Sequence, residues 1–149
     1  MMDYQFTKNQ SSQEDIQEHL LACDKYFVPS LSSRVELPQY ALKLFQKAER
    51  FEAWHMNKLV ALVAVYANNL ADKTAFITSV SVMPDHMGKG LAGELLRSCF
   101  AQLKTLTFQK VFLEVSSSNE KAVKLYKKLG FMFLAKKDEN NHILVYNLK

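Results

Sequence analysis

The stretch LVALVAVYA, residues Leu59–Ala67, is apolar at every position and is the feature that most constrains the fold. A strand of this kind is buried on both faces, so it belongs in the interior of a sheet that is covered on both sides. Helices are the usual cover for such a sheet. We therefore expect an α/β (α+β) protein with a central mixed sheet and helices on both of its faces.

Length and composition favour one packed domain, residues 1–149. The chain has 149 residues with 48% hydrophobic content, which excludes global disorder. Cys23 and Cys99 are far apart, and the four histidines have no metal-ligand spacing, so we expect neither a disulfide framework nor a metal site. No apolar run reaches membrane-spanning length, and MMDYQFTKNQ at the start is not a secretory stretch. These features predict a cytoplasmic protein without a membrane partner.

The second half of the chain is basic. Residues 1–85 carry 8 Lys/Arg and 10 Asp/Glu, whereas residues 86–149 carry 11 and 5. This excess predicts an anionic partner or simply solvated helix faces. Because the lysines are mostly single, without arginine clusters or interleaved aromatic residues, a phosphorylated cofactor fits better than nucleic acid.

Hydrophobic periodicity predicts the element order β-α-α-β-β-β-α-β-α-β-β. An irregular loop should cover residues 28–40, which include Pro29 and Pro38. The expected strands are 4–7, 51–56, 59–67, 75–82, 110–115, 131–135 and 143–148. The expected helices run from 11 or 12 to about 27, over 40–48, from the glycines at 88–93 to about 103, and within 116–130. In the last of these, Asn119 is a candidate N-cap and Gly130 fits the C′ position, where a positive φ costs glycine little.

The segment Gly88–Gly93, GKGLAG, has the form G-x-G-x-x-G between a predicted strand and a predicted helix. Closely spaced glycines let backbone N–H groups converge, and a helix N-terminus adds partial positive charge. An anion, most plausibly a pyrophosphate, should bind here. Lys89 either adds a point charge or is a solvated loop residue.

The same pattern occurs in dinucleotide-binding proteins, but the surroundings argue against a nicotinamide cofactor. Five residues, Met83–Met87, separate the strand from the first glycine. Glu114, at the spacing of the ribose-binding acid, is followed by Val115 within its apolar run. Only 35 residues follow Glu114, too few for the second half of a doubly wound sheet.

Two motifs resemble those of the GNAT acetyltransferase superfamily, and the resemblance covers nearly the whole chain. SVSVMPDHMGKGLAGELL is similar to the family's acetyl-CoA motif, a strand, a loop Q/R-x-x-G-x-G/A and a long helix; Met87 stands where Gln or Arg is usual, which removes a side-chain hydrogen bond. LEVSSSNEKAVKLYKKLGF is similar to the second motif, N-x-x-A-x-x-L-Y-x-x-L-G-F. The residues that match are Gly90, Ala92, Asn119, Ala122, Leu125, Tyr126, Leu129, Gly130 and Phe131.

The resemblance implies a three-layer fold with a mostly antiparallel sheet of about seven strands, and a site for acetyl-CoA. The strand ending at residues 80–82 should splay from the strand at 113–116 and pair with the pantetheine arm, although plain pairing of the two strands is the alternative. Asn119 either binds the pantetheine or caps its helix. The implied cofactor-binding residues are Val80, Ser81, Val82, Met87, Gly88, Lys89, Gly90, Leu91, Ala92, Gly93 and Asn119.

Tyr126 is the implied general acid, because a phenol can protonate a departing thiolate; core packing is the alternative. Glu114 is a candidate base, if partial burial raises the pKa of its carboxyl. His55, Tyr66 or a water chain are other options for the base. Arg34, in the loop 28–40, either binds a carboxylate or phosphate of the acceptor or faces solvent.

The family resemblance implies an N-acetyltransferase, an enzyme that moves the acetyl group of acetyl-CoA to a small-molecule primary amine. Direct transfer in a ternary complex is favoured, because neither Cys23 nor Cys99 lies in an activated setting. The alternatives are a non-catalytic acyl-CoA-binding or interaction module and an NAD(P)-binding enzyme. The chain is expected to be a monomer or a homodimer.

Overall fold

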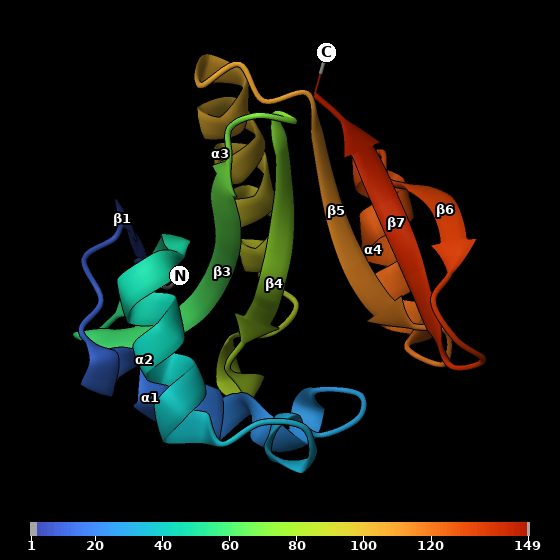
Figure 1. The fold of residues 1–149 in the computed structure, drawn as a ribbon. Coiled ribbons are helices and arrows are strands. Elements are labelled where there is room, and N and C mark those ends of the chain that lie inside the picture. Colours follow the sequence, from blue (N-terminus) through green and yellow to red (C-terminus); the bar gives the residue numbers. More distant parts are fainter. Residues whose placement is uncertain (1–2, 149) are drawn as a thin grey trace.

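The computed structural model describes residues 3–148, which form one seven-stranded sheet with helices on both faces (Figure 1). Residues 1, 2 and 149 of the predicted domain lie outside the described part. The strands are β1 (Gln5–Lys8), β2 (Glu49–His55), β3 (Lys58–Asn69), β4 (Thr74–Val82), β5 (Lys110–Ser116), β6 (Met132–Lys136) and β7 (Asn141–Asn147). The α-helices are α1 (Gln13–Cys23), α2 (Leu37–Lys47), α3 (Leu91–Thr105) and α4 (Glu120–Leu129), and short 3-10 turns are η1 (Asp24–Tyr26), η2 (Leu31–Ser33) and η3 (Pro84–His86).

The strands lie in the order β1-β2-β3-β4-β5-β7-β6, and every neighbouring pair is antiparallel except β4–β5. The prediction of a mixed, mostly antiparallel sheet is therefore confirmed. β3 lies between β2 and β4, and its residues Leu59–Val65 are buried on both faces, as the apolar run requires.

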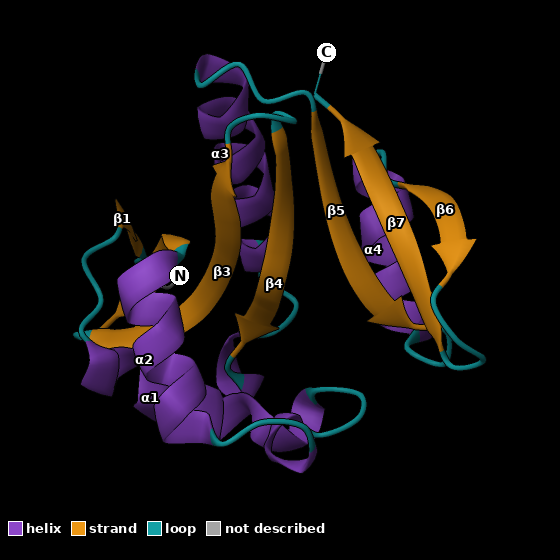
Figure 2. Ribbon diagram, viewed as in Figure 1, coloured by secondary structure: helices purple, strands orange, loops and turns teal. Residues whose placement is uncertain are grey.

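Two hydrophobic cores lie on opposite faces of the sheet. One core joins α1 and α2 to the face formed by residues such as Leu62 and Ala64 of β3. The other joins α3, α4 and the opposite face, including Val63 of β3. Figure 2 shows α1 and α2 in front of the first part of the sheet, whereas α3 and α4 lie behind it. Within residues 3–148, no helix covers the front of β5, β7 and β6 in this view.

Two predicted helix boundaries need correction. α2 begins at Leu37 rather than near Tyr40, because Pro38 falls in the first helical turn, where its missing N–H has no cost. α1 ends at Cys23, and η1 continues the chain as a 3-10 turn to Tyr26, short of the predicted end at Phe27. In α4 the predicted caps are confirmed: Asn119 is the N-cap, and Gly130 has a φ of 111° at the C-terminal end.

A buried ion pair ties the N-terminal segment to β2. Glu52 is fully buried and accepts hydrogen bonds from the backbone N–H of Gln10 and Ser11 and from the hydroxyls of Thr7 and Ser11. Arg50 Nε lies 3.5 Å from Glu52 Oε2, and its guanidinium also donates to backbone carbonyls at the end of α2. These bonds satisfy charges that would otherwise be costly to bury.

The sheet opens between β4 and β5. The two strands pair from Thr74↔Lys110 to Ile77↔Leu113 and no further, while β4 stays paired with β3 as far as Val82↔Ala61. A register shift in the β3–β4 ladder lies at the same level, between Ala64 and Val65. Beyond Ile77 the two strands diverge, as Figure 1 shows, so the predicted splay is confirmed. Among the described strands, none pairs with the edge of β4 from Thr78 to Val82 that faces β5.

Within residues 3–148, none of the helices combines the length and the apolar character required to cross a lipid bilayer.

Candidate active site

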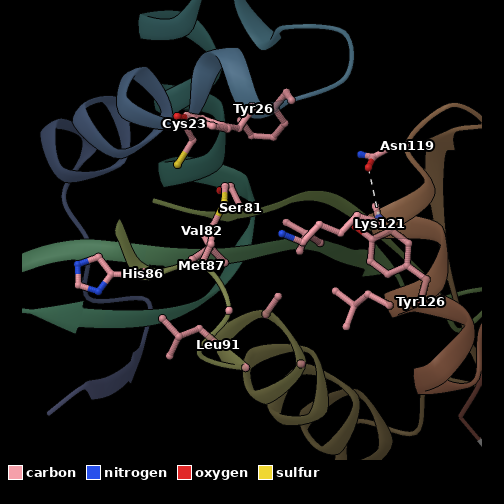
Figure 3. Close-up of a pocket in the computed structure, with 18 residues that line it drawn as sticks. Cys23, Tyr26, Ser81, Val82, His86, Met87, Leu91, Asn119, Lys121 and Tyr126 are labelled. Carbon is pink, nitrogen blue, oxygen red and sulfur yellow. Dashed lines mark hydrogen bonds between the residues drawn. The ribbon is translucent and has the colours of Figure 1, made fainter. Parts of the chain in front are cut away.

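A cavity of about 300 Å³ lies where β4 and β5 diverge (Figure 3). Its walls come from the end of β4, from the loop that precedes α3, from α4 and from the segment after α1. The lining residues are Cys23, Tyr26, Phe27, Val80, Ser81, Val82, His86, Met87, Gly88, Gly90, Leu91, Ala92, Gly93, Asn119, Lys121, Ala122, Leu125 and Tyr126. We name this space the loop cavity.

The glycine loop turns the chain sharply before α3. Gly88 and Gly90 have φ values of 78° and 77°, a region that side chains rarely adopt. A Cβ atom at either position would meet no atom within 4 Å, so the space above both glycines is open. Gly90 is the N-cap of α3 and supplies no side chain, which leaves the first N–H groups of the helix free for another acceptor. This end of the loop cavity suits an anion.

The loop cavity brings together most of the predicted cofactor-binding residues. Lys89 is exposed and is not among the residues that line the cavity, which fits its interpretation as a solvated loop residue. Lys121, at the start of α4, points into the cavity instead (Figure 3). Sequence reasoning missed Lys121, although its place two residues after the N-cap Asn119 put it close to the predicted site.

Asn119 caps its helix, as one of the two interpretations required. Its side-chain oxygen accepts from the backbone N–H of Ala122 at 3.3 Å. The residue also lines the loop cavity, so capping and contact with a ligand are compatible.

His19 of α1 forms a hydrogen bond to the end of β4 from the face of the sheet that α1 covers. A carbonyl oxygen only accepts, so Nδ1 of His19 donates to Leu59 O at 2.9 Å, and Nε2 accepts from the hydroxyl of Ser81 at 2.8 Å. Burial lowers the pKa of His19 to about 4, so the imidazole is neutral. Ser81, which lines the loop cavity, is therefore fixed by a buried side chain 62 positions away.

The two cysteines are poor nucleophiles. Burial raises the pKa of both Cys23 and Cys99 to about 12. Cys23 lines the loop cavity with its Sγ 3.7 Å from His19 Nε2. Both thiols stay protonated near neutral pH, which agrees with the expectation that no acyl-enzyme forms.

A second cavity, of about 420 Å³, lies on the other side of the opening; we name it the outer cavity. Its walls are the segment 26–40, the middle of β4, the end of β5 and the connection between β6 and β7. Tyr126 lines both cavities, together with Asn119 and Ala122 on the same helix.

Tyr126 belongs to the core and to the site at once. Its ring packs edge-on against Phe131 with 5.7 Å between ring centroids, and only 8% of the residue is exposed. Burial raises the pKa of its phenol above the usual range, so the hydroxyl keeps its proton. A neutral phenol between two cavities can donate a hydrogen bond to a group that becomes negative there.

Glu114 differs from its expectation. It was expected to be partly buried, with a raised pKa, but it is exposed, because Leu113 and Val115 belong to the core beneath α3 and α4 and the residue between them points to the opposite face of the sheet. Its carboxylate forms an ion pair with Lys137, with 2.8 Å between Oε1 and Nζ. The same contact raises the pKa of Lys137. Glu114 also lines the outer cavity.

The other proposed bases lie apart from Tyr126. His55 belongs to a cluster of three rings with Tyr4 and His86, at centroid distances of 5.2–5.7 Å, and lines neither cavity. Tyr66 has a buried hydroxyl without a hydrogen-bond partner among the described residues, yet it also lies outside both cavity linings.

Arg34 lines the outer cavity, and its side chain is exposed. Ser79 of β4 lines the same cavity and is 5% exposed. Its hydroxyl is buried and has no hydrogen-bond partner among the described residues. Sequence reasoning missed Ser79 and Lys137, because both become part of a site only through contacts between distant strands.

Among residues 3–148, no group of three or more His, Cys, Asp and Glu side chains is arranged to hold a metal ion. The fold also excludes the doubly wound sheet of the NAD(P)-binding alternative, because only one of the six strand pairs is parallel.

Comparisons with known proteins agree with this geometry. The acetyltransferase (GNAT) family model matches residues 14–131. A spermidine N(1)-acetyltransferase from Vibrio cholerae is 33% identical over 75 residues, which are 50% of this chain and 43% of that protein. The match thus spans less than half the length of this relative.

Solved structures share the fold at low identity. The PaiA N-acetyltransferase from Thermoplasma acidophilum, in complex with coenzyme A, superposes with a TM-score of 0.78 at 15% identity, over 98% of this chain and 99% of that one. The ribosomal-protein-S18-alanine N-acetyltransferase from Escherichia coli gives a TM-score of 0.73 at 19% identity, over 97% and 95% of the two chains.

Proposed function

Because this chain belongs to the acetyltransferase (GNAT) family, we propose that residues 1–149 act as one N-acetyltransferase domain that transfers an acetyl group from acetyl-CoA to a primary amine. Transfer is direct, within a ternary complex. The observation that carries the proposal is the position of Tyr126, whose side chain lines both the loop cavity and the outer cavity. One cavity then holds the acetyl donor, the other holds the amine, and the two meet at a protonated phenol.

The residues of the loop cavity fit coenzyme A. Open space above Gly88 and Gly90 and the free N–H groups at the start of α3 suit its pyrophosphate. The unpaired edge of β4, Val80–Val82, suits the amides of its pantetheine arm, which act like an added strand. Lys121 adds positive charge on the opposite wall. Met87 contributes its backbone only, because its thioether is a weak acceptor and no donor.

Bound acetyl-CoA supplies an acetyl thioester, an acyl group with a thiolate leaving group. The amine nitrogen forms a bond to the acyl carbon, and the carbon–sulfur bond breaks. Tyr126 donates a hydrogen bond toward the sulfur, where negative charge develops. The amine gives up one proton overall, and the thiol gains one. The neutral thiols of Cys23 and Cys99 support direct attack by the amine.

The acceptor must be a neutral amine when it attacks. Glu114 is the sequence-based candidate for proton removal, and its Oε1 is already engaged by Lys137 Nζ at 2.8 Å. Glu114→Gln tests the assignment: a base role predicts a large loss of kcat, whereas an electrostatic role changes mainly the KM of the amine.

The proposal is tested by thioester consumption and by ligand-induced stabilisation. We expect thiol release from acetyl-CoA to depend on an added amine, in a panel that includes spermidine, the substrate named for the Vibrio cholerae relative. At about a hundred times Kd, acetyl-CoA should stabilise the protein by roughly 2.7 kcal/mol, and NADH should not. Stabilisation without amine-dependent thiol release would instead identify a non-catalytic acyl-CoA-binding module.

Lys121→Ala tests the loop cavity directly. It should raise the KM for acetyl-CoA and leave the KM for the amine unchanged. Lys124→Ala, at an exposed position of the same helix outside the cavity lining, is the matched control. Equal effects of the two substitutions would contradict a local role for Lys121.

A further inference from the structure

The charged residues that line the outer cavity give it a net positive charge, although the proposed acceptor is an amine. Its charged lining residues are Arg34, Glu114 and Lys137. The only carboxylate among these described residues is already paired with Lys137 at 2.8 Å. Two cations and one carboxylate leave one uncompensated positive charge. Such a cavity repels a second ammonium group and attracts a single negative charge.

The two cations lie on different walls. Arg34 follows η2 in the segment 26–40, and Lys137 belongs to the connection between β6 and β7. Both side chains are exposed, so they lie at the mouth of the cavity rather than at its base. Apart from Arg34, the lining residues from segment 26–40 are apolar or aromatic: Tyr26, Phe27, Val28, Pro29, Leu31, Val35 and Tyr40.

The deep end of the same cavity is polar and buried. Ser79, at 5% exposure, has a hydroxyl without a partner among the described residues, and a buried hydroxyl without a partner is costly. Ser79 directly precedes Val80, which lines both cavities along with Tyr126. The free hydroxyl oxygen can accept a hydrogen bond from an amine beside the phenol of Tyr126.

We infer that the acceptor carries a carboxylate at the end remote from its reacting amine, with an apolar body between the two. The inference rests on the proposed acetyl transfer. The amine lies at Ser79 and Tyr126, the apolar body contacts segment 26–40, and the carboxylate lies between Arg34 and Lys137. One uncompensated charge matches a carboxylate better than a phosphate dianion. A polyamine, which has a cation at each end, does not match.

Three probes of one skeleton test the inference on the full-length protein. They are 4-(aminomethyl)benzoate, benzylamine and 4-(aminomethyl)benzylamine, which place a negative charge, no charge and a positive charge opposite the same amine. Spermidine completes the panel. Amine-dependent thiol release is followed at fixed acetyl-CoA. We expect kcat/KM to fall in the order benzoate, benzylamine, diamine, with about a fivefold step for each contact of about 1 kcal/mol.

Substitutions of the charged lining residues should change the KM of the benzoate in opposite directions. Arg34→Gln should raise the KM of the benzoate about fivefold and leave that of benzylamine unchanged. Lys137→Gln should raise the KM of the benzoate more than Arg34→Gln does, because the substitution also frees the Glu114 carboxylate. Glu114→Gln frees Lys137 and should lower that KM. Lys136→Gln, an exposed change outside the cavity lining, is the control. Ser79→Ala should raise the KM of all three probes alike.

The outcomes separate the inference from the proposed function. If the diamine, spermidine or benzylamine is used as well as the benzoate or better, the inference is wrong and amine acetylation stands. If Arg34→Gln affects the benzoate and benzylamine equally, the assigned carboxylate contact is wrong. If no amine in the panel releases thiol above the amine-free control, the proposed function itself fails.

Discussion

Gly130→Ala should destabilise the protein by about 2–5 kcal/mol, from two separate causes. Gly130 has a φ of 111°, and left-handed backbone costs a residue with a Cβ about 1–2 kcal/mol. A Cβ would also lie 2.9 Å from Cε2 of Tyr146. That ring has little room to move, because it stacks on Phe100 at a centroid distance of 4.1 Å and contacts Phe131. Such overpacking adds about 1–3 kcal/mol.

Gly88→Ala is the matched control, since Gly88 has a φ of 78° but no atom within 4 Å of its Cβ position. It should show the backbone cost alone. For a domain of this size the melting temperature falls roughly 2–4 °C per kcal/mol, so Gly130→Ala should lower it by about 4–20 °C and Gly88→Ala by clearly less. Differential scanning calorimetry without ligand measures both. Equal shifts would refute the assignment of a steric conflict at Tyr146.

Three further predictions concern the site and its supports. Tyr126→Phe should lower kcat roughly 100-fold while the stabilisation by acetyl-CoA persists; a kcat within twofold of the parent would exclude the acid role. The pKa of His19, about 4 when folded, lies below its unfolded value of about 6.5. The contribution of neutral His19 to the free energy of unfolding is therefore fully present above pH 6.5 and decreases as the pH falls toward 4. Urea unfolding should show a loss of about 2 kcal/mol at pH 5 that is absent in His19→Gln; an unchanged pH dependence in this variant would contradict the assignment. Arg50→Met should lower the free energy of unfolding at pH 7 by about 3–5 kcal/mol, because it leaves the Glu52 charge buried without its partner, and a loss below 1 kcal/mol would contradict that reasoning.

Features encoded within one element could be predicted from the sequence. The interior strand β3 was visible because every residue of the run 59–67 is apolar. The caps of α4 were visible because Asn119 and Gly130 have local conformational preferences that act without the rest of the chain. The start of α2 was misplaced because Pro38 is compatible both with a loop and with a first helical turn.

Features formed by residues distant in the sequence could not be predicted in the same way. The bond between His19 and Ser81 spans 62 positions, and the pair of Glu114 and Lys137 joins a strand to a turn. Neither leaves a periodic pattern in the sequence. Whether a carboxylate is buried or lies at the surface in an ion pair depends on residues distant in the sequence. The burial predicted for Glu114 was wrong for this reason. The motif located the loop cavity correctly, but not which nearby lysine points into it.

The short β4–β5 ladder leaves the two halves of the sheet joined by few backbone hydrogen bonds. Only the four pairs from Thr74↔Lys110 to Ile77↔Leu113 connect the two strands of this parallel junction. They lie at one end of the junction, so beyond Ile77 no ladder joins β5 to β4 among the described residues. A molecule bound in the opening contacts both strands beyond these pairs and should suppress local opening of the short ladder. Amide hydrogen exchange at Thr74 and Ala75, which line neither cavity, should then slow on ligand binding.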